Sequence, residues 1–119
     1  MVGKYILERF GISSESAVGS EFRYSTVNTI DNDSVIIAVS QSGETADTIA
    51  SVKEAKNRGA YITSIINVAG SSLTRISDEN IYIYSGPEIA VASTKAYIGQ
   101  LVSVIILVLF IALEKGRID

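Results

Sequence analysis

The chain has 119 residues, of which 47% are hydrophobic and 19% are charged, and its formal net charge at pH 7 is −3. This length predicts one domain that buries a core of its own, and the weak acidic charge without a basic stripe argues against a nucleic-acid partner. Cysteine and histidine are both absent, which excludes disulfides, thiolate nucleophiles and the commonest metal ligands. We therefore expect neither a metal site nor a cofactor.

Apolar patterns and turn residues predict helices that alternate with strands. The expected elements, in chain order, are a helix over 4–10 ended by Gly11, a strand over 17–19, a turn or short helix over 20–24, a strand over 34–39, a helix over 45–58, a strand over 61–67, a turn with a short helix over 69–78, a strand over 81–84, a loop over 86–93 and an apolar helix to about residue 115. This alternation predicts a three-layer α/β fold around a parallel sheet, in a single domain over 1–119.

The uncharged stretch 96–113 raises the question of a membrane span, which needs about 17–25 residues. Gly99, Gln100 and Ser103 dilute its first half, and neither another span nor a basic flank biased to one side accompanies it. We therefore favour a buried or subunit-interface helix over a membrane anchor. A helix that is apolar on nearly all sides has to be covered all round. We therefore expect a homodimer and no membrane partner. The start of the chain does not resemble a signal peptide, so a cytoplasmic location is the default expectation.

The most informative segment is 40–45, Ser-Gln-Ser-Gly-Glu-Thr, because it joins a buried strand to a helix. We expect this turn to direct backbone N–H groups and hydroxyls to one spot, beside the positive end of a helix dipole. Such a spot suits an anion, and phosphate above all. Ordinary helix capping by Ser42 or Thr45 explains the same residues equally well when the turn is taken alone.

Two further loops, 67–72 and 85–94, combine glycine with serine or threonine and follow strands of the same predicted sheet. Ligands of parallel sheets bind beyond the carboxyl ends of the strands, so the three loops are expected to meet at one edge. Ser71 and Ser72 are best explained as turn and cap residues. Lys95 is unfavourable with the dipole at a helix start, which suggests a role beyond helix stability.

The runs at 40–48, 70–73 and 91–96, together with Ser-Glu-Phe-Arg-Tyr at 20–24, resemble the sugar isomerase (SIS) domain family over 4–119. Within it they are most similar to the isomerase domains of glutamine–fructose-6-phosphate aminotransferases, also called glucosamine-6-phosphate synthases. The resemblance implies a flavodoxin-like parallel sheet and a bound hexose phosphate. By position it assigns phosphate binding to Ser40, Gln41, Ser42 and Thr45. It assigns contacts with the sugar to Val91 and Ser93, and a possible auxiliary role to Lys95.

The chain also departs from that family. The resemblance implies a first strand with a Gly-Thr-Ser loop that is missing here. That strand is central in the family's sheet, so its loss would leave a gap or expose strand edges. It also places a ring-opening histidine, a proton-moving glutamate and a lysine beyond residue 119, and a glutaminase half elsewhere. We therefore expect either direct pairing of the flanking strands or repair by association with another chain.

Three hypotheses for function follow. The first is a partial isomerase-type SIS domain, functionally part of amino-sugar synthesis, that binds a sugar phosphate such as fructose 6-phosphate or glucosamine 6-phosphate. Its catalytic residues would all come from other segments, so whether it is an enzyme stays open, as does the identity of the sugar phosphate. The second is a non-catalytic module that senses sugar phosphate for a partner. The third is a fragment of a split gene.

Overall fold

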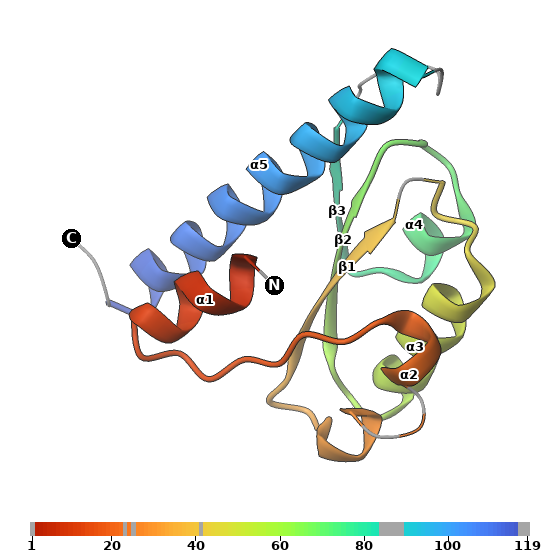
Figure 1. Ribbon diagram of the computed structural model, residues 1–119. Coiled ribbons are helices and arrows are strands. Elements are labelled where there is room, and N and C mark those ends of the chain that lie inside the picture. The colour runs from red at the N-terminus through yellow and green to blue at the C-terminus, as the bar shows by residue number, and fades with distance from the viewer. Residues whose placement is uncertain (1, 23, 25, 41, 84–89, 117–119) are drawn as a thin grey trace.

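The structure is a computed structural model that describes residues 2–22, 24, 26–40, 42–83 and 90–116, with only the backbone described for 2 and 90–97. A parallel sheet lies between two layers of helices (Figure 1). The elements, in chain order, are α1 (Val2–Arg9), α2 (Gly19–Phe22), a 3-10 helix η1 (Thr26–Thr29), β1 (Val35–Ser40), α3 (Ala46–Asn57), β2 (Tyr61–Ile66), α4 (Ser72–Ile76), β3 (Glu79–Tyr82) and α5 (Ala90–Glu114).

The described sheet has the order β1-β2-β3, and both pairings are parallel. Residues 35–40 pair in register with 61–66, and 63–66 pair with 79–82. Each parallel pairing requires a crossover, which α3 and α4 provide. Helices α2, α3 and α4 cover one face, while α5 covers the other with α1 packed against it (Figure 1). The predicted three-layer α/β class with a parallel sheet is confirmed.

The core is built around β2, the strand with partners on both sides, which is buried on both faces from Ile62 to Ile66. Ile62 and Ile66 have no exposed surface and pack with Val52, Ala55 and Leu73 in one hydrophobic cluster under α3 and α4. Burying an isoleucine of this kind contributes about 1.5–3 kcal/mol relative to leaving it exposed. The cluster therefore fixes the face of the sheet on which α3 runs, and with it the direction in which α3 starts.

Three local predictions have clear outcomes. The first helix ends as expected, since Gly11 has φ +73° and the N–H of Ile12 reaches the carbonyl of Leu7 at 2.9 Å. The prediction of a strand over 17–19 is wrong. Its last residue, Gly19, starts α2 instead, and the Gly19 carbonyl accepts a hydrogen bond from Ser51 Oγ of α3 at 2.9 Å. The predicted loop over 86–93 extends too far, because α5 already begins at Ala90.

One edge of the described sheet is open. β1 pairs with β2 alone among the described strands, and a groove of about 790 Å³ runs along its residues. The extended segment 12–17 lines the groove together with residues of α3 and Ile111 of α5. Direct pairing of the flanking strands was one of the two expected alternatives, and in the described part of the chain β1 has no strand partner besides β2. The missing first strand itself stays a prediction.

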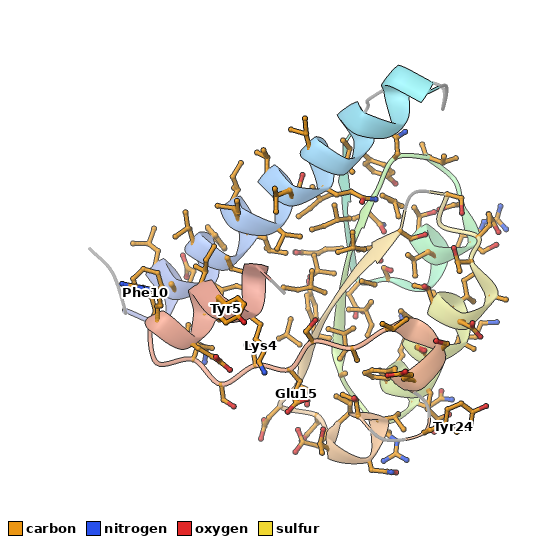
Figure 2. The ribbon with its side chains drawn as sticks, in the orientation of Figure 1. Lys4, Tyr5, Phe10, Glu15 and Tyr24 are labelled. Carbon is orange, nitrogen blue, oxygen red and sulfur yellow. The ribbon has the colours of Figure 1, made fainter. Side chains whose placement is uncertain are left out.

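Helix α5 has 25 residues, and its inner face is tightly packed. Val108 and Ala112 are buried, and Gly3 of α1 lies so close that a Cβ there would meet Val104 Cγ1 at 2.9 Å. The outer face is apolar but exposed; it comprises Ile98, Val102, Ile106, Leu109, Phe110 and Leu113. Figure 2 shows side chains on both sides of this helix. Among the described residues, none of the helices combines the length and apolarity that crossing a bilayer requires.

We predict that Gly99→Ala destabilises the fold, because an added Cβ would lie inside van der Waals contact of Ile83 Cγ2. Alanine gains about 1 kcal/mol of helix propensity over glycine, but overpacking costs about 1–3 kcal/mol. The free energy of unfolding from urea titrations should therefore fall. In an Ile83→Ala background the clash is gone, and the same substitution should become neutral or stabilising. Equal effects in both backgrounds would contradict the close approach.

Candidate functional site

The turn after β1 is folded by its own serines. Ser40, the last residue of β1, is buried, and its Oγ accepts a hydrogen bond from the N–H of Gly43 at 3.0 Å. Ser42 Oγ accepts one from the N–H of Glu44 at 3.1 Å. The expectation that the turn presents its N–H groups to an anion is therefore wrong for Gly43 and Glu44. Both hydroxyls act as acceptors in these bonds, so each keeps its own hydrogen for donation.

Thr45 occupies the N-cap position of α3 but does not cap the helix with its side chain. Its backbone is extended, with φ −63° and ψ 120°, and no side-chain cap hydrogen bond forms. Capping by hydrogen bond, the alternative explanation for this residue, is thus not seen. The first N–H groups of a helix have no intrahelical partner, so those of α3 need a partner from outside the helix, a role that an anion can fill. The exposed hydroxyl of Thr45 lies at the same place.

The structure brings the loop before α4 against this turn. Leu73 donates its N–H to the carbonyl of Gly43 at 3.0 Å. Gly43 has φ +72°, and a Cβ there would lie 2.6 Å from Ser71 Cβ, so only glycine fits. Ser71 is 3% exposed, takes the N-cap position of α4 and has an Oγ without a hydrogen-bond partner in the described structure. Two of the three predicted loops therefore meet, as expected.

Glu44 makes the second connection between the two loops, and sequence reasoning missed it. Its Oε1 accepts a hydrogen bond from the N–H of Ser72 at 2.8 Å, and its Oε2 accepts one from Ser72 Oγ at 2.6 Å. The two residues are 28 positions apart, and nothing in either local pattern indicates the contact. One signal could have revealed this contact: an acidic residue in a strand-to-helix turn, together with a serine at the start of the helix after the next strand.

The carboxyl of Glu44 has a lowered pKa. The main cause is the hydrogen bond from the Ser72 side chain, followed by that from the Ser72 backbone, and the positive charge of Arg75 adds to it. A carboxyl whose pKa falls on folding stabilises the folded state above its ordinary pKa. This contribution is lost as the pH falls through the lowered value. The two loops are therefore joined most strongly when Glu44 is ionised.

The remaining candidates lie wholly or partly outside the described residues. Gln41 is not described, and neither are the side chains of Val91, Ser93 and Lys95. The backbone places the last three in the first two turns of α5, which follows β3. Helix α5 begins at the end of the sheet where β1 also finishes (Figure 1). Among the described residues, no group of acidic side chains is placed to hold a metal ion.

Comparisons with known proteins agree on one family. The SIS domain profile matches residues 1–110. The chain is 51% identical to the glutamine–fructose-6-phosphate aminotransferase (isomerizing) of Clostridium tetani and 53% identical to that of Caldanaerobacter subterraneus subsp. tengcongensis. Both alignments cover 100% of this chain and 20% of the relative. The chain thus spans about one fifth of the length of these relatives.

Solved structures agree as well. The C-terminal domain of glucosamine-fructose-6-phosphate aminotransferase from Francisella tularensis matches with a TM-score of 0.88 at 39% identity, over 100% of this chain and 34% of that one. The fold is shared by Vibrio vulnificus NanR complexed with ManNAc-6P, at TM-score 0.77 and 22% identity over 96% and 43% of the two chains. At this level of identity the likeness to NanR shows a shared fold. By its profile match and its close relatives, this chain belongs to the SIS domain family.

Proposed function

We propose that the chain binds a hexose or amino-sugar phosphate, of the fructose 6-phosphate or glucosamine 6-phosphate type, as an isomerase-type SIS domain. The observation that carries this proposal is the arrangement of the 40–45 turn. Ser40 and Ser42 use their oxygens to fold the turn and keep their hydrogens, and Thr45 leaves its hydroxyl free beside the start of α3. Hydroxyl donors at a helix N-terminus suit a phosphate without requiring arginine.

The resemblance to the family extends this proposal to residues whose side chains are not described. Gln41 would add an amide donor to the phosphate, and Val91 and Ser93 would contact the sugar. Lys95 would be an auxiliary residue that attracts the anion by its charge. The relatives' names support this class of ligand, since the two bacterial relatives are aminotransferases of fructose 6-phosphate.

We propose further that residues 1–119 bind the sugar phosphate without converting it. The chain contains no histidine, and the family resemblance places ring opening on a histidine outside these residues. Conversion would then require groups from other segments. A non-catalytic sensing or interaction module is the alternative, and a fragment of a split gene gives the same binding behaviour. A coupled assay for glucose 6-phosphate formed from fructose 6-phosphate tests whether any turnover remains.

We predict that Thr45→Val weakens binding of fructose 6-phosphate by about tenfold or more, the effect of losing one hydrogen bond to a charged group. Its thermal stability should not change, because the Thr45 side chain makes no cap bond. Isothermal titration calorimetry with fructose 6-phosphate, glucosamine 6-phosphate and unphosphorylated fructose measures both affinity and the need for phosphate.

Thr29→Val is the matched control, since Thr29 lies on η1, before β1 begins. Its affinity should equal that of the unmodified chain. The absence of binding of both phosphates by a folded sample would overturn the proposal, and so would equal binding of unphosphorylated fructose.

We also propose that the chain forms a homodimer through the exposed face of α5. Ile106 and Phe110 are 62% and 56% exposed and lie one turn apart on this face. Apolar side chains at this spacing form a stripe that a second copy of the helix can cover. The open edge of β1 is a second surface at which another chain could complete the fold. A cytoplasmic location stays a prediction.

We predict a dimeric mass in multi-angle light scattering, which Ile106→Glu should convert to a monomeric mass with unchanged helix content. Burying a charge in an apolar interface is costly, so one substitution at the centre of the stripe suffices. Lys53→Glu, on the exposed surface of α3 across the sheet, is the control and should stay dimeric. A monomeric mass for the unmodified chain would rule out the dimer.

A further inference from the structure

Three hydrogen bonds join the turn to α4, and two neighbouring residues of the turn, Gly43 and Glu44, accept them. The Gly43 carbonyl accepts one from Leu73, and the Glu44 carboxylate accepts two from Ser72. The carboxylate bonds are charge-assisted, which makes them stronger than the bond between the two backbones. Glu44 therefore contributes most of the polar attachment between these loops, although its side chain is exposed.

Glu44 also presents an electrostatic difficulty. It stands directly before Thr45, in a turn that we propose to bind a phosphate dianion. Two like charges near each other at a site weaken anion binding unless one is turned away or compensated. In the structure the carboxylate is directed to Ser72 at the start of α4, and Arg75 of the same helix adds a favourable positive charge.

The packing below the turn limits where it can move. A side chain at position 43 would overlap Ser71, so the turn already lies in direct contact with the start of α4. It cannot shift further towards that helix. Without the Glu44 bonds it could shift only outwards, and the released carboxylate could then approach the anion.

We propose that Glu44 is a positioning residue of the sugar-phosphate site. By bonding to Ser72, it fixes the phosphate-binding turn on α4 and keeps its own negative charge directed away from the bound phosphate. This inference rests on the proposed function, since it assigns a role to a residue of that same site. It predicts that a free carboxylate at position 44 is worse for binding than a neutral side chain.

Four variants separate charge from attachment: Ser72→Ala, Glu44→Asp, Glu44→Gln and the double variant Glu44→Gln with Ser72→Ala. Ser72→Ala removes the hydroxyl bond, so that only the backbone N–H of residue 72 still donates to the carboxylate, and Glu44→Asp keeps the charge on a side chain too short to make both bonds. Each should weaken fructose 6-phosphate binding by roughly tenfold in calorimetry. Glu44→Gln removes the charge, so it should bind more tightly than Glu44→Asp, and the double variant should recover most of the loss of Ser72→Ala.

If Glu44 only stabilised the fold, the double variant would bind fructose 6-phosphate as weakly as Ser72→Ala does, or more weakly. That result would overturn the inference. Amide hydrogen exchange of residues 42–45 supplies a readout without ligand, and it should become faster in Ser72→Ala and in Glu44→Asp. Unchanged exchange in both would overturn the inference by itself. If the unmodified chain binds no sugar phosphate while exchange responds as expected, the proposed function fails and the attachment of the turn by Glu44 stands.

Discussion

The parallel pairing of β1 with β2 is the constraint on which the site depends. Because residues 35–40 pair in register with 61–66, Ser40 and Ile66 end level with each other, and the loops that follow leave the sheet side by side. That proximity allows Gly43 to contact Ser71 and Glu44 to reach Ser72. The pairing is held in place by the buried face of β2 under α3 and α4. The hydrophobic core thus sets the position of polar groups that lie outside it.

The serine hydroxyls at this edge of the sheet use one part of their hydrogen-bonding capacity to fold the turn, and the other part is the one that we propose for binding. A serine hydroxyl can accept and donate at once, and here its accepting side closes the turn. The donating side is the part that we propose for the ligand. A turn built from arginines would bind an anion with charge alone, whereas the binding proposed for this turn would require a ligand whose oxygens lie at fixed positions. Glu44 fits the same logic, since its charge is satisfied by hydrogen bonds on the side of α4.

Much of this was predictable, and the exceptions have physical causes. The strands β1 and β2 and the helix α3 were expected because continuous apolar runs and helical spacing are local signals. The strand over 17–19 was wrong because a strand needs a partner, and Gly19 instead bonds to Ser51, 32 residues away. Glu44 was missed for the same reason, since its partner Ser72 is set by the register of two strands. The turn between β1 and α3 was predicted because its residues are contiguous. What depends on contacts between distant residues cannot be found in a local pattern.

The position of β1 at an edge of the described sheet affects which part of the molecule unfolds first. β2 has partners on both sides and is almost wholly buried, whereas β1 has one partner among the described strands and exposes Val35 and Val39. Strands with fewer contacts open at lower free energy than the core. Ser40 belongs to the less protected strand, and Ser71 and Ser72 follow the more protected one. We therefore expect the two halves of the site to separate by local fraying while the hydrophobic cluster stays folded, so that binding capacity is lost at a milder stress than the fold.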